Sequence, residues 1–402
     1  DWHIGRALYN RKRYDEFEAF LNWLVDIIER ENIDVLLVAG DVFDNTTPSN
    51  RAQELYYRFL CRVAASAHRH VVIIAGNHDS PSFLDAPRQL LKFLNVHVVG
   101  CISLDPADEV IVISDHEGEA RLIVCAIPYL RDRDIRTAEE GESVEDKERK
   151  IIEGIRTHYR LVCDTAERQR TGLAKPLPII AMGHLFAAGG RTVDGDGVRE
   201  LYIGTLAQVK TDVFPESIDY LALGHLHVPQ TVGGSEVIRY CGSPLPMGFG
   251  EAGQQKGVVV VEFGENDPYI KSIPIPCFQE LKTIRGNWTD IAAGINELKN
   301  KGSNAWLEIT YEGDEITSNL QERLEELLDG CALEILRTKN NRVIERALAG
   351  MNPGETLDDL DTTDVFKRCL KSNNVPEEQQ ATLLSAYQEI ILSIQEQDTR
   401  QE

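Results

Sequence analysis

The chain has 402 residues, 42% of them hydrophobic and 27% charged, which is ordinary for a folded protein of roughly two or three domains. Its 65 Asp and Glu residues against 42 Lys and Arg residues give a formal net charge of −23, which argues against tight, autonomous binding to a polyanion such as DNA. No apolar run approaches the ~20 residues needed to span a bilayer, and no signal-peptide pattern is visible, so we expect no membrane association.

The eight cysteines are scattered and form no C-x-x-C pair. This spacing indicates buried free thiols in a reducing compartment and excludes a disulfide or zinc framework. We therefore expect a cytoplasmic protein.

Helical and strand-like patterns alternate through residue 263. Residues 14–31 and 52–63 carry apolar side chains at helical spacing. Residues 33–41 are nearly all apolar and end in Gly-Asp, as expected for a buried strand with functional groups at its carboxyl end, and residues 70–79 repeat this design. These patterns predict an α/β fold with a layered core. Further strand-like runs are LIVCAIP, PIIAMGH, YLALGH, VIRYCGSP and GVVVVEF.

The pattern changes near residues 273–278, where two prolines interrupt it. Residues 279–337 then follow the order strand, helix, strand, helix, strand, which predicts a small separate α+β unit. Residues 351–402 are acidic and carry an apolar stripe at helical spacing. We therefore predict three parts, comprising residues 1–277, 278–345 and 346–402.

Five short motifs bring together polar residues, and most of them directly follow a predicted buried strand. A glycine precedes the polar residue in four of them, which we expect to let the backbone turn sharply, so that the next side chain points into a shared cleft. The motifs are DWH (Asp1, His3), GDVFD (Asp41, Asp44), GNHD (Asn77, His78, Asp79), GH (His184) and GHLH (His225, His227).

Each motif alone has an ordinary explanation. An Asp-x-His pair is usually a surface pair or a helix cap, and a single buried histidine is usually just hydrogen-bonded. GHLH is stronger, because it places two imidazoles on the same face of an extended segment. All five motifs in order are difficult to explain by packing.

Two carboxylates, one amide and four imidazoles can fill two adjacent metal sites. Mixed oxygen and nitrogen ligands without thiolate suit Mn²⁺, Fe or Zn²⁺ better than Ca²⁺. A shared carboxylate would hold two metals at the ~3.5–4 Å spacing of two-metal hydrolases, which activate a bridging water toward a phosphate ester. His78 is left over from this ligand set as a proton donor or charge stabiliser, and we expect Asp79 to orient its imidazole.

With all five motifs intact across roughly residues 1–245, the chain resembles the calcineurin-like metallophosphoesterases. The segments DWHIGR, VAGDVFDNTTPS, AGNHDSP, YIGTL, ALGHLH and YCGSPLP, followed by a small α+β unit and helices, resemble the bacterial nucleases of that superfamily. The resemblance implies an α/β/β/α core, a capping domain and C-terminal helices. In that family a strand precedes the Asp-x-His motif, so we expect the native protein to begin several residues earlier.

The resemblance also implies the ligand set, residue by residue. Asp41 would bridge two divalent metals, with manganese expected first and Mg²⁺, Fe and Zn²⁺ as alternatives. His78 would be the catalytic histidine that binds no metal, with Asp79 beside it. One metal would take Asp1, His3, Asp41 and His227, and the other would take Asp41, Asn77, His184 and His225.

For the rest of the chain the resemblance implies partners. The capping unit would help to shape a DNA groove, and the C-terminal helices would dock on an SMC-like ATPase. Such nucleases act on double-stranded ends and on single strands or hairpins, as a homodimer within a heterotetramer. The helices that would form the dimer carry Tyr56, Phe59, Leu60, Leu84, Leu90 and Phe93, for which core packing within the subunit is the alternative.

Three points stay open from the sequence. The metal motifs fit a phosphatase or phosphodiesterase acting on a small molecule or nucleotide equally well, although such an enzyme does not need the extra domain and tail helices. A non-catalytic scaffold is a second alternative, and His78 argues against it. Residues 147–175 hold eight Lys or Arg against four acidic residues, and the segment YLRDRDIR adds Arg131, Arg133 and Arg136. These cations are either phosphate contacts or, for most of them, part of a solvated, charge-mixed helix face.

Overall fold

The computed structural model divides the chain into two compact units, Asp1–Gln279 and Glu280–Glu402. No helix among the described residues is long and apolar enough to cross a membrane. The structure describes residues 1–65, 69–137, 139, 141–173, 177–187, 190, 209–264, 267–313 and 320–340, together with positions 366, 367, 370, 380, 383, 384 and 387.

The first unit contains two sheets. A parallel sheet has the order β3-β4-β5, with β3 at Val35–Ala39, β4 at His70–Ile74 and β5 at Val96–Val99. A mixed sheet has the order β10-β11-β9-β8-β7-β6, in which β7, β8, β9 and β11 are mutually parallel. Its strands are β6 (Val110–Ser114), β7 (Ala120–Ala126), β8 (Ile179–His184), β9 (Tyr220–Gly224), β10 (Gln230–Val232) and β11 (Ser235–Tyr240).

Alternate residues of these strands face two different apolar layers. In β4, Val72 and Ile74 pack with Val124 and Met182 of the second sheet, so the two sheets face each other. The neighbouring Ile73 faces the other way, into a core shared with helices. The resulting α/β/β/α layering confirms the predicted fold class.

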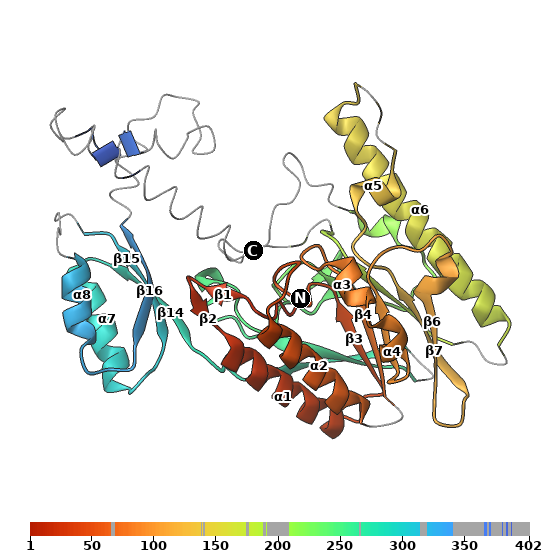
Figure 1. Ribbon diagram of the computed structural model, residues 1–402, viewed down its shortest axis with the longest axis horizontal. Coiled ribbons are helices and arrows are strands. Elements are labelled where there is room, and N and C mark those ends of the chain that lie inside the picture. The colour runs from red at the N-terminus through yellow and green to blue at the C-terminus, as the bar shows by residue number, and fades with distance from the viewer. Residues whose placement is uncertain are drawn as a thin grey trace. The chain divides into compact units, whose positions relative to one another are not determined.

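Helices cover both outer faces (Figure 1). The face of β3–β5 is covered by α1 (Tyr14–Arg30), α2 (Asn50–Ala64), α3 (Pro81–Asp85) and α4 (Arg88–Lys92). The face of the second sheet is covered by α6 (Val144–Thr171). The helices predicted at 14–31 and 52–63 are present as α1 and α2, because their apolar residues form one stripe against the sheet.

Several short elements join these layers. They are the hairpin β1 (Ala7–Leu8) and β2 (Arg11–Lys12), the helix α5 (Asp132–Ile135), the 3₁₀ turns Pro106–Glu109, Thr211–Val213 and Phe249–Glu251, and the antiparallel ribbon β12 (Gly257–Glu262) and β13 (Tyr269–Pro274).

The second unit has the predicted order of strands and helices. Its elements are β14 (Leu281–Gly286), α7 (Trp288–Asn300), β15 (Trp306–Tyr311), α8 (Leu320–Leu328) and β16 (Glu334–Asn340). All three strands are parallel, in the order β14-β15-β16, so the unit consists of two consecutive βαβ crossovers. Ile291, Ile295 and Leu324 of the helices pack on one face of this sheet.

The predicted C-terminal helices fall almost entirely outside the described residues. Of the apolar stripe expected there, Leu383, Leu384 and Tyr387 are described, and the Tyr387 ring stacks on Phe366 at a centroid distance of 4.1 Å.

Candidate metal centre

The predicted site residues lie where the two sheets meet. Strands β3 and β4 of one sheet and β8 and β9 of the other end next to each other, because the carboxyl ends of parallel strands share an edge. Asp41, Asn77 and His78 follow the first pair, and His184 and His225 end or follow the second. The Asp-x-His segment joins them through its backbone, because the His3 amide donates to the Asp41 carbonyl at 2.9 Å.

His3, Asp41 and His227 converge on one point. The Nε2 atoms of His3 and His227 are 3.1 Å apart, although 224 residues separate them in the chain. The His3 Nε2 atom also lies 3.6 Å from the Asp41 Oδ2 atom. His3 is fully buried, and the other two side chains are nearly so.

His184, His225, Asn77 and the same Asp41 form a second group. The Asn77 Oδ1 atom lies 2.9 Å from His184 Nε2 and 3.0 Å from His225 Nδ1. The Asp41 Oδ2 atom lies 3.3 Å from His184 Nε2. One carboxylate oxygen therefore faces both groups, which is the arrangement expected of a bridging ligand.

The hydrogen bonding of His184 indicates what these atoms bind. Its Nδ1–H donates to the Ala39 carbonyl at 2.9 Å, so the neutral ring presents a lone pair at Nε2. That lone pair faces the acceptor oxygens of Asn77 and Asp41. Three acceptors that point at one another in a buried space repel unless a cation lies among them. The donor set is imidazole, carboxylate and amide oxygen, which suits a first-row divalent metal.

Burial favours the neutral, ligating form of two of the imidazoles, those of His225 and His3. Burial and the neighbouring His184 lower the pKa of His225 to about 3, and burial also lowers the pKa of His3. Burial acts to raise the pKa of Asp41, but His184, His3 and His78 outweigh it and hold this pKa well below its usual value. The Asp41 carboxylate is therefore ionised, as a bridging ligand must be.

His78 is anchored at both its backbone and its ring. Its backbone N–H donates to Asp41 Oδ1 at 2.9 Å, and its Nδ1–H donates to the Asp44 carbonyl at 2.8 Å. The ring lies edge-to-face with that of His3, at a centroid distance of 4.8 Å. His78, His3 and Asp41 have ligand atoms within 4.8 Å of one another, so this imidazole lies at the first metal group.

Asp79 braces the loops and is not the partner of the His78 ring. Its Oδ1 accepts the backbone N–H of Phe43, and its Oδ2 accepts those of Val42 and Gly76. Burial and the nearby Asp41 raise the pKa of Asp79 to about 6, although these three hydrogen bonds act in the opposite direction. The orienting partner of the imidazole is instead the carbonyl of Asp44.

Asp44 was identified in the GDVFD motif without a role. Its Oδ1 lies 3.4 Å from His3 Nδ1 and 3.3 Å from the Arg6 guanidinium. Asp44 therefore contacts His3 through its side chain and His78 through its backbone. The second carboxylate of the motif was the available signal, but only the fold shows which ring each of its atoms faces.

Asp1 lies at the edge of the site. Its Oδ1 accepts the backbone N–H of His225 at 2.8 Å and lies 3.6 Å from His184 Nδ1. Among the described residues it falls in neither of the two groups whose ligand atoms lie within 4.8 Å of one another. Its assignment as a ligand beside His3 and His227 stays a prediction.

Three site residues other than glycine have positive backbone φ angles, which are 50° at His3, 44° at Asp41 and 102° at His225. Such conformations cost on the order of 1–3 kcal/mol each and persist only where the surroundings impose them. Strain of this kind is typical of functional sites, because it aims a side chain in a direction that relaxed backbone does not allow.

The glycines of the motifs do more than permit turns. Gly40 has a φ of 85° and does make a left-handed turn. For Gly76 and Gly224 the reason is close packing, because an added Cβ would lie 2.2 Å from Asp41 Oδ1 in one case and 1.8 Å from the Ala39 carbonyl oxygen in the other. The expectation of sharp turns is therefore correct for the first of these glycines, whereas the other two let neighbouring loops touch.

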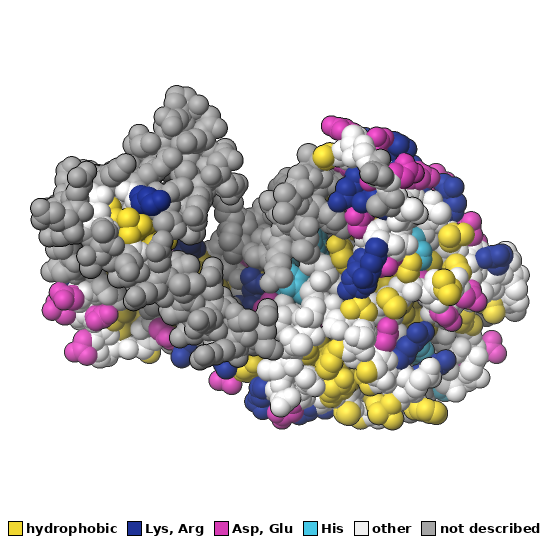
Figure 2. Space-filling view, turned by 45° about the horizontal axis from the view of Figure 1, so that its top comes forward, with side chains coloured by type: hydrophobic (Ala, Val, Ile, Leu, Met, Phe, Trp, Pro, Cys, Tyr) yellow, Lys and Arg dark blue, Asp and Glu magenta, His cyan; other side chains and the backbone are white. Residues whose placement is uncertain are grey.

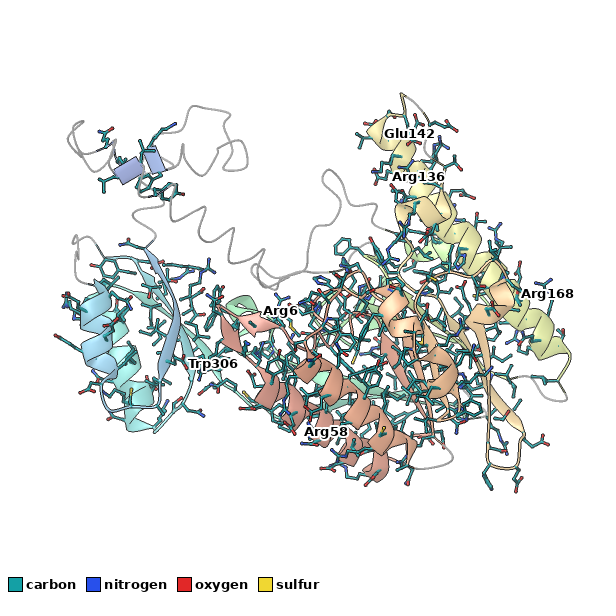
Figure 3. All side chains as sticks on the ribbon, in the orientation of Figure 1. Arg6, Arg58, Arg136, Glu142, Arg168 and Trp306 are labelled. Atoms are coloured by element: carbon teal, nitrogen blue, oxygen red, sulfur yellow. The ribbon has the colours of Figure 1, made fainter. Side chains whose placement is uncertain are left out.

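Most of the basic residues considered as phosphate contacts are paired with acids. Arg136 forms hydrogen bonds with Asp132 and Glu142. Figure 3 labels Arg136 and Glu142, which lie close together. Lys150 lies 2.9 Å from Glu139 and from Glu142. Figure 2 shows dark blue and magenta side chains interspersed across the described face. This pairing favours a charge-mixed face over a phosphate-binding surface for these residues.

Comparison with known proteins agrees with this site. Residues 1–229 match the model of the calcineurin-like phosphoesterase family, and residues 277–374 match a model described as the type 5 capsule protein repressor C-terminal domain. The chain is 34% identical to the SbcD subunit of the nuclease SbcCD from Escherichia coli K12, over 95% of its own length and 94% of that protein. It is 39% identical to the Rhodobacter capsulatus protein of the same name over 69% of this chain and 68% of that one. Its identity to the Bacillus subtilis protein of that name is 34%, over 65% of this chain and 64% of that one.

Proposed function

Since the chain belongs to the calcineurin-like phosphoesterases, and within them to the SbcD nucleases, we propose that it is the manganese-dependent DNA nuclease subunit of a complex with an SbcC-type, SMC-like ATPase. The coarser statement, that it is a metal-dependent nuclease hydrolysing phosphodiester bonds, follows from the family. The proposal adds to this statement the identity of the metal as manganese, the form of DNA that is cleaved and the ATPase partner.

The observation that carries the proposal is the convergence of acceptor atoms on two adjacent points that share the Asp41 Oδ2 atom. Two divalent metals bound there would activate a water and neutralise charge on a phosphodiester. His3 and His227 would hold one metal together with Asp1. Asn77, His184 and His225 would hold the other, and Asp41 would contact both.

His78 would act on the phosphate without binding a metal. Because its Nδ1–H donates to the Asp44 carbonyl, the opposite ring nitrogen, Nε2, remains for the substrate. A protonated Nε2 would stabilise charge on a phosphate oxygen or give a proton to the leaving oxygen. The backbone hydrogen bond to Asp41 ties the position of this histidine to that of the bridging carboxylate.

We propose linear duplex ends as the exonuclease substrate, and single strands or hairpins as the endonuclease substrates, in DNA break repair and recombination. In the proposed division, residues 1–277 would cleave the DNA. Residues 278–345 would help to shape the DNA groove, and residues 346–402 would bind the ATPase. This proposal is supported by the alignment with the Escherichia coli K12 subunit of SbcCD, which covers 95% of this chain.

A homodimer within a heterotetramer is also proposed, acting in the cytoplasm and at the nucleoid. Helix α4 and the residues that follow it supply the support for the dimer. Leu90 is 69% exposed and Phe93 is 88% exposed, while Leu91 between them is buried. An acidic protein that exposes two large apolar side chains so close together is expected to cover them with another surface. Tyr56, Phe59 and Leu60, by contrast, pack inside the subunit.

The test uses the purified chain with Mn²⁺ and two substrates in parallel, linear duplex DNA and a nitrophenyl phosphodiester. His78→Ala is the inactive variant, and His116→Ala, which changes an exposed histidine, is the matched control. We expect DNA cleavage by the wild type and the control, and a loss of about 100-fold or more in the His78 variant with Mn²⁺ binding retained.

The alternative outcomes differ clearly. Hydrolysis of the small ester with no DNA cleavage, even after an SbcC-type ATPase is added, would identify a small-molecule phosphodiesterase. Equal activity of His78→Ala on DNA would remove the proposed role of this histidine.

A further inference from the structure

The segment YCGSPLP and the residues after it wrap around His227. The Ser243 backbone N–H donates to the His227 carbonyl at 3.1 Å. Gly242 passes so close that an added Cβ would lie 2.6 Å from the same carbonyl oxygen. This segment therefore contacts a candidate metal ligand, although none of its own residues belongs to the ligand set.

A buried ion pair lies directly behind His227. Lys256 is 4% exposed and Glu251 is fully buried, and the two form a salt bridge. The Lys256 ammonium also donates to the His227 carbonyl at 2.9 Å and to the Ser243 hydroxyl at 3.1 Å. Two charges so deeply buried need a reason, because taking them out of water costs several kcal/mol per ion before pairing.

The carboxylate of Glu251 faces the imidazole of His227. Its Oε2 accepts the backbone N–H of Met247 at 3.1 Å, and its Oε1 lies 3.8 Å from His227 Nδ1. The other nitrogen of the ring, Nε2, is the atom that faces His3 at 3.1 Å. The ring therefore stands between a buried carboxylate and the candidate metal position.

We propose that Glu251 is a positioning residue for metal binding, which keeps the proton of His227 on Nδ1 and its lone pair on Nε2, and that Lys256 compensates the buried charge and clamps the backbone of the same histidine. The inference rests on the proposed function in that it takes His227 as a ligand. A carboxylate behind a ligating imidazole fixes the tautomer and raises the basicity of the ligand, and its loss typically weakens metal binding by 10–100-fold.

A second buried ion pair provides the matched control. Arg13 is 2% exposed and forms two hydrogen bonds with Glu16, and its Nη1 donates to the Pro246 carbonyl at 2.6 Å. This pair holds the same segment through Pro246, and among the described residues no hydrogen bond or ion pair joins it to an imidazole of the site. The pairs thus match in burial and in the segment that they brace, and they differ in contact with a ligand.

The experiment titrates Mn²⁺ into the full chain without DNA and follows free Mn²⁺ by electron paramagnetic resonance. We compare the wild type with Glu251→Gln, Glu16→Gln and His227→Ala. Glu251→Gln is expected to weaken one of two Mn²⁺ sites by about 10–100-fold, as a milder form of the His227 variant. Glu16→Gln is expected to leave both dissociation constants within about twofold of wild type. Equal Mn²⁺ affinities in the Glu251 and Glu16 variants would overturn the inference.

Folding must be separated from metal binding. If Glu251→Gln alone unfolds, because Lys256 is left uncompensated, the double variant Glu251→Gln/Lys256→Met removes both charges together. It should fold, as judged by circular dichroism without metal, and still lose affinity at one site. A folded double variant with wild-type affinity would contradict the inference. Two Mn²⁺ sites in a wild type that cleaves no DNA, even with an SbcC-type ATPase added, would instead refute the proposed function alone.

Discussion

Gly183 lies against the hydroxyl of Tyr159 so closely that a Cβ on the glycine would be 1.9 Å from that oxygen. The tyrosine comes from α6 and the glycine from β8, immediately before His184. The hydroxyl is fully buried, has no hydrogen-bond partner among the described residues, and has a pKa that burial raises well above its usual value. Helix α6 therefore limits the space at Gly183, the residue next to the candidate ligand His184.

Replacing Gly183 by alanine should force α6 away from the sheet. We expect Gly183→Ala to destabilise the metal-free protein by about 1–3 kcal/mol, as overpacking does. Tyr159→Phe should be neutral or slightly stabilising, because it removes an unpaired buried hydroxyl. The double variant should recover most of the loss, which urea unfolding of the four proteins would measure. Additive effects of the two substitutions would exclude the proposed contact.

Asp79 should matter for stability as well as for activity. Three buried backbone N–H groups lose their acceptor in Asp79→Ala, so we expect a loss of about 2–4 kcal/mol at pH 8, where the carboxylate is ionised. The control is Asp44→Ala, since that carboxylate faces His3 and Arg6. If Asp79 served only to orient an imidazole, its variant would lose hydrolysis and keep the wild-type unfolding midpoint.

Acidification should weaken the fold through His97, which lies in β5 away from the metal centre. Burial, then His70 and the nearby cations Lys92 and Arg88, lower its pKa from 6.5 to about 4. Below pH 6.5 the unfolded chain therefore binds a proton that the folded chain does not, and stability falls as the pH drops toward 4. Melting curves in a chelator should show His97→Gln losing about 2–4 °C less than wild type between pH 7 and 5. If His97→Gln showed the same pH dependence of stability as the wild type, the lowered pKa of His97 would be contradicted.

The exposed apolar residues at α4 give a direct test of the dimer. Phe93→Glu combined with Leu90→Glu should yield a monomer by light scattering, because two charges would have to be buried in the interface. Leu104→Glu, which changes a fully exposed leucine elsewhere, should leave the dimer intact. A monomeric wild type, or a dimer that tolerates both acidic substitutions, would refute the proposed interface.

The sequence predicted the layered core and the position of the site for one physical reason. Buried parallel strands read as apolar runs, and their carboxyl ends must lie at one edge, so Asp41, Asn77 and His184 could be brought together without coordinates. The backbone angles were not predictable, because the left-handed φ at His225 results from neighbours that are distant in sequence.

The contacts that hold the site residues in place could not be predicted from the sequence. A backbone carbonyl such as that of Asp44 leaves no mark on residue identity, and the pairing of Glu251 with Lys256 resembles any other pair of charges in a loop. Adjacency to His78 suggests Asp79 as its partner, whereas the Asp79 side chain accepts the amides of Val42 and Phe43 in a different loop and that of Gly76 in its own. The cations of α6 were ambiguous until their acidic neighbours were placed.

The order of the site residues along the chain has a consequence for synthesis. The first candidate ligand region ends at His3 and the last at His227, and the ion pair behind the latter is completed only at Lys256. A nascent chain that has emerged only as far as β8 presents His3 and Asp41 without His225 and His227. Both candidate metal groups therefore stay incomplete during translation until His225 and His227 have emerged from the ribosome, and a product truncated before them lacks a ligand of each group.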